Sequence, residues 1–300
     1  MEILTQRFNA LGTQCEIILE GNLSAQLTSV ASNAVAEIRR FEAKYSRYQE
    51  KSLVSEINQN AGKRQTKIDP ETFGLLNYAS QCFIESGGLF DITSGVLRSV
   101  WQKGMSRLPL ESDVRRCLEL VDWRAVSVGQ DFVFLELPGM ELDFGGFGKE
   151  YIADLVAVQI RSNGIEHGLI NLGGDIAVVG PHVSGEPWII GIRHPVKTDE
   201  PIALLELFTG GLTTSGSYER YFDLKGHRYS HILNPNTGWP VDGLLSVSAI
   251  ASQTLVAGTI CTIALLKGAE DGLAWLNNCG TPYLAVDSEF HISGELGPAT

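Results

Sequence analysis

The sequence predicts an α+β fold in which antiparallel strands are flanked by helices. Three observations support this prediction. Amphipathic helical patterns and apolar strand patterns are mixed along the chain, and short glycine-containing turns join several strand pairs. No repeat of fixed period and no linker rich in Pro or Ser divides the sequence. We therefore expect residues 1–300 to form a single large domain, with two intertwined lobes as a variant of that arrangement.

The first half of the chain predicts a hairpin followed by helices. Residues 3–19 form two extended pieces around a glycine, which is typical of a hairpin. Apolar residues recur at helical spacing over 24–45 and predict an amphipathic helix. A second helix is predicted over 70–86, because Asp69 can cap it and a proline occupies its first position. The polar, glycine-rich stretch 88–110 favours a loop and then a short helix, a place where chemistry can be located.

The second half predicts more strands and three further helices. A helix is expected directly after the glycines that precede residue 149, so that a strand, a glycine loop and a helix follow one another. The remaining elements are two short strands within 126–144, the helix 149–162, buried strands within 168–180 and 187–195, an apolar run over 202–221, a hairpin around Lys225 and Gly226, and helices over 254–266 and 269–276.

Composition excludes several classes of protein. The chain has 23 Lys and Arg against 35 Asp and Glu, a formal net charge of −12, which argues against nucleic acid or an anionic membrane as its partner. The five cysteines show neither zinc-type spacing nor close pairs, which favours a reducing compartment. The first residues lack the pattern of an export signal, so we expect a cytoplasmic protein, or a periplasmic one if a signal has been removed.

One uncharged stretch, residues 243–266, is long enough to cross a bilayer. Its first part alternates like a strand, and its second part has helical spacing with several Ser and Thr residues. This pattern predicts a buried strand followed by a buried helix, so we expect no membrane insertion.

The motif DFGGFGKE at 143–150 is suited to binding an anion. Its glycines allow backbone amides to turn toward a phosphate, and the helix that follows contributes its N-terminal amides. Lys149 adds a full positive charge at the same place. The alternative is a tight strand-to-helix junction with Lys149 exposed to solvent, since the motif is neither a Walker loop nor a dinucleotide fingerprint.

Two further motifs are candidates for the same site. Residues 171–175, NLGGD, allow a close approach of the backbone around Gly174 and end in Asp175, although a plain β-turn explains them equally. Thr214, Ser215 and His231 are connected by a predicted hairpin and can converge, although a single histidine in a strand is more often structural. Hydroxyls, a histidine and glycine loops favour phosphoryl or nucleotidyl transfer over acyl transfer, because the Gly-x-Ser-x-Gly motif is missing.

Read in order, eight stretches resemble the FAD:protein FMN transferase family, the ApbE-like flavin transferases formerly described as thiamine biosynthesis lipoproteins. Each stretch is short, but their order and coverage make the resemblance strong. The stretches are LGT at 11–13 and those at 41–58, 90–97 (FDITSGVL), 142–154 (LDFGGFGKEYIAD), 169–176 (LINLGGDI), 214–222, 231–241 (HILNPNTGWPV) and 254–266.

The resemblance implies an ApbE-like fold that binds FAD, uses Mg²⁺ and moves FMN onto a Thr or Ser hydroxyl of an acceptor flavoprotein subunit, with release of AMP. By matching motifs, His231 and Lys149 are the expected catalytic residues, and Thr262 and Gly148 the expected metal-binding ones. The FAD contacts implied in the same way are Tyr48, Asp91, Gly146, Lys149, Gly174, Asp175, Thr214 and Ser215.

The chain departs from the family pattern at three positions. Gly258 stands where the family has an aspartate four residues before the threonine, Glu150 replaces a glycine, and Asn234 replaces an aspartate. The loss at Gly258 is expected to weaken Mg²⁺ binding, and Gly258→Asp to raise Mg²⁺-dependent release of AMP. Three interpretations follow. The protein is an active transferase with Glu150 or Asp242 supplying the missing charge, an FAD-binding homologue without activity, or an enzyme that hydrolyses FAD to FMN and AMP.

Overall fold

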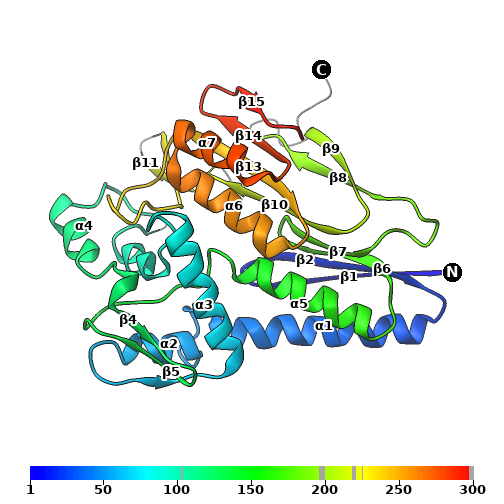
Figure 1. The fold of residues 1–300 in the computed structure, drawn as a ribbon, viewed down its shortest axis with the longest axis horizontal. Helices are drawn as coiled ribbons and strands as arrows, with labels where there is room; N and C mark the ends of the chain where they lie inside the picture. The colour runs from blue at the N-terminus through cyan, green and yellow to red at the C-terminus, as the bar shows by residue number, and fades with distance from the viewer. Residues whose placement is uncertain (103, 196–199, 218–220, 225, 297–300) are drawn as a thin grey trace.

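The fold is a broad antiparallel sheet with helices along one face and a smaller mixed region beside it (Figure 1). The computed structural model describes residues 1–102, 104–195, 200–217, 221–224 and 226–296. The predicted α+β class with antiparallel strands and flanking helices is confirmed.

In the described part of the chain, the main sheet has eight strands in the order β1-β2-β6-β7-β10-β13-β14-β15, and every neighbouring pair is antiparallel. The predicted N-terminal hairpin is β1-β2, and it joins the sheet through the pairing of β2 with β6. Distant parts of the sequence therefore meet at the strand ends. The strands are β1 (Glu2–Ala10), β2 (Thr13–Gly21), β6 (His167–Leu172), β7 (Asp175–Gly180), β10 (Gly210–Gly216), β13 (Leu244–Ala251), β14 (Tyr283–Asp287) and β15 (Ile292–Ser293).

Four helices cover one face of this sheet (Figure 1). Helix α1 packs on β1, β2 and α5 with the apolar side chains that repeat at helical spacing, from Leu27 to Phe41. Helix α6 is apolar on nearly all sides because it lies between the sheet, α5 and α7. The bounds are α1 (Ser24–Tyr45), α5 (Gly148–Ser162), α6 (Thr254–Lys267) and α7 (Ala269–Cys279), close to those predicted.

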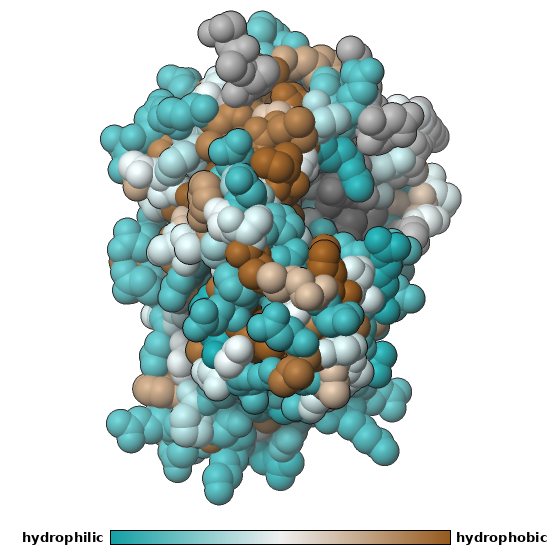
Figure 2. Space-filling model, turned by 90° about the vertical axis from the view of Figure 1, so that its right-hand side faces the viewer, coloured by the Kyte–Doolittle hydropathy of each residue, from teal (hydrophilic) through white to brown (hydrophobic). Residues whose placement is uncertain are grey.

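The opposite face of the sheet is partly covered by a separate hairpin, β8 (Trp188–Arg193) and β9 (Pro201–Leu207). Buried and exposed residues alternate along β8, so Trp188 and Ile190 pack on the main sheet while Ile189 stays exposed. Figure 2 shows the side of the molecule that lies on the right in Figure 1. Hydrophobic side chains gather mainly in the upper half of this view, whereas its lower end is hydrophilic.

The smaller region lies between α1 and α5 in the sequence. Its short sheet has the order β3-β5-β4. The prediction that Asp69 begins a helix at Pro70 is confirmed, because the Asp69 carboxylate accepts a hydrogen bond from the Thr72 amide. The elements are α2 (Leu53–Gln59), β3 (Thr66–Lys67), α3 (Pro70–Glu85), the 3₁₀ helices η1 (Ile92–Ser99) and η2 (Trp123–Ala125), α4 (Glu111–Leu118), β4 (Val126–Val128) and β5 (Phe132–Leu135).

Two sequence expectations in the last third also hold. The uncharged stretch 243–266 forms β13 and then α6, and none of the described helices is long and apolar enough to cross a membrane. The predicted hairpin near residue 226 is β11 (Tyr221–Leu224) with β12 (His227–Ser230). Lys225, which was expected in its turn, lies outside the described residues, as do positions 218–220 of the motif that begins at 214.

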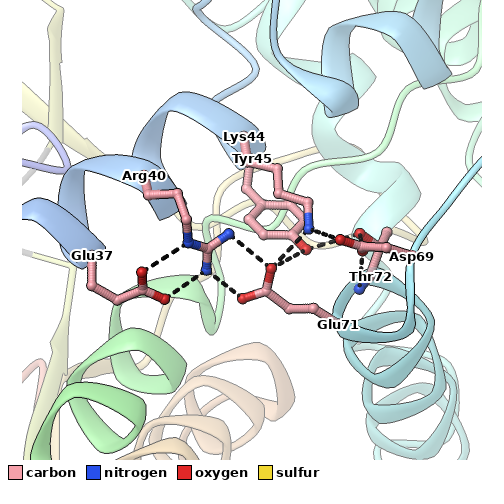
Figure 3. Close-up of polar contacts among 7 residues, drawn as sticks. All are labelled: Glu37, Arg40, Lys44, Tyr45, Asp69, Glu71 and Thr72. Atoms are coloured by element: carbon pink, nitrogen blue, oxygen red, sulfur yellow. Dashed lines mark hydrogen bonds and ion pairs between the residues drawn. The ribbon is translucent and has the colours of Figure 1, made fainter. Parts of the chain in front are cut away.

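A group of five charged side chains, called here the α1–α3 ion cluster, ties α1 to the start of α3 (Figure 3). Its centre is Glu71, whose carboxylate accepts hydrogen bonds from Arg40 at 2.6 and 3.0 Å and from Lys44 at 2.8 Å. Arg40 also binds Glu37, and Lys44 also binds Asp69 at 2.5 Å. Each charge of the cluster therefore has an opposite charge in contact.

Candidate active site

A cleft of about 1470 Å³ opens where the ends of β2, β6, β7 and β10 approach the loops before η1 and α5. Its volume exceeds that of most small-molecule sites, about 300–1,000 Å³, and suits a dinucleotide. It collects nine of the residues expected from the sequence, which come from segments far apart in the chain. They are Asp91, Gly146, Lys149, Gly174, Asp175, Thr214, Ser215, His231 and Thr262.

Lys149 and Asp175 form an ion pair across this cleft, between Nζ and Oδ2. Lys149 lies in the first turn of α5, and Asp175 is the first residue of β7. The lysine side chain keeps 27% of its surface exposed, whereas the aspartate keeps 5%. The buried carboxylate thus holds the ammonium group at the cleft wall, beside the N-terminus of a helix that favours an anion.

The two glycine turns are shaped partly by neighbouring side chains. The Gly145 amide donates to Asp143 and the Gly174 amide to Asn171, each at 2.8 Å. Gly173 has φ +71°, and a side chain there would collide with Thr13 of the β1-β2 hairpin. The turn interpretation of NLGGD therefore accounts for Gly173 and Gly174, and Lys149 contributes a positive charge to the cleft wall.

Hydroxyl groups line the cleft on both sides of β10. Thr214 is hydrogen-bonded to Ser248 of β13 at 2.8 Å, and Ser215 to Thr262 of α6 at 3.3 Å. Successive residues of a strand point to opposite faces, so Ser215 faces the helix layer and Thr214 the other side. Thr262 is therefore fixed at the cleft by its contact with the strand.

His231 enters the cleft from the segment that follows β12. It is partly buried and lies beside Ile232 and Leu233, which also line the cleft. Asn234 lies outside the lining, and its side chain accepts hydrogen bonds from the amides of Asn236 and Thr237. The asparagine that stands here in place of the family's aspartate therefore lies in a turn, which its own side chain stabilises.

Glu150 is a buried carboxylate of the cleft. It is 5% exposed, and Oε2 has no hydrogen-bond partner among the residues that the structure describes. Burial raises its pKa, and the negative charge of Asp175 raises it further. Asp242, the other candidate for a replacement charge, is exposed, lies outside the lining and accepts from the Gly243 amide.

The structure reverses the expectation for Gly258→Asp. A β-carbon at Gly258 would lie 2.7 Å from Cγ and from Oε1 of Glu150, which is closer than real contacts allow. The space for a side chain at this position is already filled by the glutamate. A second carboxylate there would collide with the first and repel it, so we now expect this substitution to lower activity.

Two expected residues lie outside the lining, and one has a structural role. Tyr48 is 80% exposed at the surface, and Gly148 is the first residue of α5, packed on Phe41. Asp91 lines the cleft, but its carboxylate accepts from Thr93 at 2.8 and 2.6 Å and from the Trp123 amide at 3.0 Å. Burial raises the pKa of Asp91. Its contacts show that it holds loops together around the site.

Sequence reasoning missed Arg98 and Asp143, which line the cleft at the glycine loop. Their side chains are 3.1 Å apart, and Arg47 also binds Asp143 at 3.4 Å. Burial would raise the pKa of Asp143, but the two arginines outweigh it and lower the pKa. Asp143 occurs in the stretch 142–154 that carried the family resemblance, and Arg98 directly follows the stretch 90–97; that placement was the available signal.

The sheet, the helix layer and the cleft define an α+β protein with a cleft large enough for a dinucleotide, and known proteins share this fold. The crystal structure of the ApbE protein from Thermotoga maritima superposes with a TM-score of 0.91 at 28% identity, covering 98% of this chain and 97% of that one. The apo flavinyl transferase ApbE from Pseudomonas stutzeri gives 0.88 at 25% identity, covering 100% and 98%.

Sequence comparison identifies the family. The ApbE family model matches residues 11–285, and the chain belongs to the ApbE family. A FAD:protein FMN transferase from Klebsiella pneumoniae is 34% identical over 83% of this chain and 78% of its own length. Another from Treponema pallidum is 28% identical over 89% and 79%.

Proposed function

We propose that this protein is a FAD:protein FMN transferase, which moves the FMN half of FAD onto a Thr or Ser hydroxyl of an acceptor protein. The observation that supports it most is the convergence of Lys149, Asp175, Ser215 and His231 on one dinucleotide-sized cleft. The family and the names of the relatives agree with this assignment.

The reaction exchanges the phosphoanhydride bond of FAD for a phosphate ester bond to the acceptor. The hydroxyl oxygen of the acceptor attacks the FMN phosphorus, the pyrophosphate P–O bond breaks, and AMP leaves with the bonding electrons. Negative charge develops on the bridging oxygen, so a cation beside it lowers the barrier. Lys149 is assigned as this cation, because it lines the cleft and is held at the cleft wall by Asp175.

The acceptor hydroxyl must also lose its proton. His231 is assigned as the group that accepts it, because an imidazole titrates near neutral pH and this residue reaches the cleft. The half-buried hydroxyls of Thr214 and Ser215, each already hydrogen-bonded, are assigned to hold the nucleotide in place. Tyr48 and Gly148 are left out of this assignment because they lie outside the cleft.

Mg²⁺ is part of the proposal, and the side chains present fit it. The described residues contain no group of three or more His, Cys, Asp or Glu side chains that could hold a metal. Mg²⁺ does not need one, because it keeps several waters and takes phosphate oxygens with one or two carboxylates. The buried, unpartnered Oε2 of Glu150 and the Thr262 hydroxyl would hold it. When bound, the ion would neutralise charge on the phosphates.

The test is incubation of the purified protein with FAD, Mg²⁺ and a candidate acceptor subunit. We expect AMP release together with flavin fluorescence that stays on the acceptor in a denaturing gel. An acceptor whose Thr or Ser is replaced by Val or Ala is the control and should remain unlabelled. Release of AMP and FMN without labelling would identify a hydrolase instead, and FAD binding without either product would identify a binding protein.

A further inference from the structure

Glu150 and Gly258 occupy one space from two helices. Glu150 projects from the first turn of α5, and Gly258 belongs to α6. The hypothetical β-carbon of Gly258 would collide with Cγ, Cδ and Oε1 of Glu150, at 2.7, 3.0 and 2.7 Å. The buried glutamate can lie in this position only if residue 258 has no side chain.

The shared space lies on the side of α6 that reaches the cleft. Gly258 and Thr262 are four residues apart and therefore lie on the same helix face, with Thr262 lining the cleft. Glu150 also lines it, 5% exposed, with one carboxylate oxygen unpartnered among the described residues. Asp175, 3% exposed, adds a second buried negative charge to the same lining. A buried carboxyl group of this kind stays ionised when a cation is in contact with it, and otherwise it takes up a proton.

We propose that Glu150 and Gly258 act as a unit in which α5 supplies the anionic ligand of a divalent cation and the glycine on α6 makes room for it. This inference rests on the proposed function for its purpose, but not for its test. The unit assigns a positioning role to a residue without a side chain, and it makes the two positions interdependent. The carboxylate can come from either helix, but not from both.

The first experiment measures binding of Mn²⁺ alone by electron paramagnetic resonance, as a probe for the site. We expect Glu150→Gln to weaken Mn²⁺ binding at least as much as loss of a second-shell partner does, about 10- to 100-fold. Gly258→Ala should weaken it in the same direction by displacing the glutamate. Gly74→Ala is the matched control, because Gly74 is in a helix and a β-carbon there meets nothing within 4 Å; its Mn²⁺ affinity should equal that of the wild type.

The second experiment exchanges the carboxylate between the helices. Glu150→Gly and Gly258→Asp alone should each lose Mn²⁺ affinity, whereas the double variant should regain most of it, which neither destabilisation nor misfolding predicts. Circular dichroism and melting temperature confirm that each variant is folded. The inference is overturned if the wild type does not bind Mn²⁺, if Glu150→Gln binds it equally well, or if the double variant is no better than the singles.

The two proposals fail separately. If the wild type labels an acceptor but Glu150→Gln keeps full Mn²⁺ affinity, the paired-position inference is wrong and FMN transfer stands. If Mn²⁺ affinity follows the exchange of the carboxylate but no acceptor or FAD chemistry is found, the inference stands and the proposed function is wrong.

Discussion

The α1–α3 ion cluster and the charges of the cleft are built from similar residues but differ in how completely they are paired. In the cluster, the single carboxylate of Glu71 accepts hydrogen bonds from three donors, Arg40, Lys44 and the Tyr45 hydroxyl (Figure 3). In the cleft, Lys149 pairs with Asp175, and one oxygen of Glu150 is left without a partner among the described residues. A fully paired group fixes two helices together, whereas an incompletely paired one is suited to bind a ligand.

The same contrast appears in the protonation of the two glutamates. Burial raises the pKa of Glu71, but Arg40 and Lys44 outweigh it and lower the pKa below the usual value. Burial also raises the pKa of Glu150, and there Asp175 adds to the effect. Neighbouring cations thus keep the first carboxylate ionised, while the second needs an added cation. Four substitutions test this comparison, from the largest expected effect to the smallest.

The largest effect is expected for His231→Ala. Removing a group that accepts a proton in the reaction should lower the rate of FMN transfer by about 10²- to 10⁴-fold. The dissociation constant of FAD should change little, because the loss is in the chemical step. His182→Ala is the control, since His182 pairs with Glu20 outside the cleft lining. A transfer rate within twofold of the wild type would remove His231 from the mechanism.

The second effect concerns FAD affinity. Lys149→Ala should weaken FAD binding by about 1.5–3 kcal/mol, the range of a charge-assisted hydrogen bond, and isothermal titration calorimetry measures it. Lys44→Ala removes a lysine from the fully paired cluster and should lower the melting temperature without changing FAD affinity. Equal FAD dissociation constants for Lys149→Ala and the wild type would contradict the assignment of Lys149 to the phosphates of FAD.

Sequence patterns predicted local elements better than their arrangement. The spacing of apolar residues gave α1 its bounds, and Asp69 with Pro70 gave the start of α3, because both signals are local. The strand order was not predicted, since β2 pairs with β6 about 150 residues away and such contacts leave no local pattern. Helices α2 and α4 are too short to show clear periodicity.

In the candidate site, too, local motifs were predicted better than contacts between distant segments. Motifs that turn sharply, such as those holding Lys149 and Asp175, converge in the cleft as expected. The expectation for Gly258→Asp left out the packing of Glu150, because only the three-dimensional structure shows that this side chain fills the space beside Gly258. Tyr48 lies in a resembling stretch but at the surface, since a short match does not fix the direction of a side chain.

A smaller effect is expected on stability in the ion cluster. Glu71→Gln keeps the volume but removes the charge that joins Arg40 and Lys44, and its side chain is only 19% exposed. We expect a loss of about 1–2 kcal/mol, between the values for exposed and buried ion pairs. Urea unfolding measures it, with Glu111→Gln as the control, because the Glu111 side chain is 76% exposed in its pair with Arg115. Equal stability of the two variants would mean that the cluster does not fasten α1 to α3.

The smallest effect is the pH dependence contributed by Asp69. Burial raises its pKa, but the bonds from Lys44 and Thr72 outweigh it and lower the pKa to about 2. Because the folded-state pKa lies below the unfolded value of about 4, this stabilisation is complete above that value and is lost as the pH falls toward 2. The aspartate side chain is 50% exposed, so solvent screening limits the contribution to about 1 kcal/mol or less.

Urea unfolding between pH 5 and 2 tests this contribution in the wild type and in Lys44→Met. Without the ammonium group, the folded-state pKa of Asp69 moves toward the unfolded value, so the variant should lose stability less steeply as the pH falls. Added salt should reduce the difference between the two slopes, because the pair is close to solvent. If the unfolding free energies of the two proteins fall equally steeply with pH at low salt, the hydrogen bonds from Thr72, and not Lys44, set the protonation of the Asp69 carboxylate.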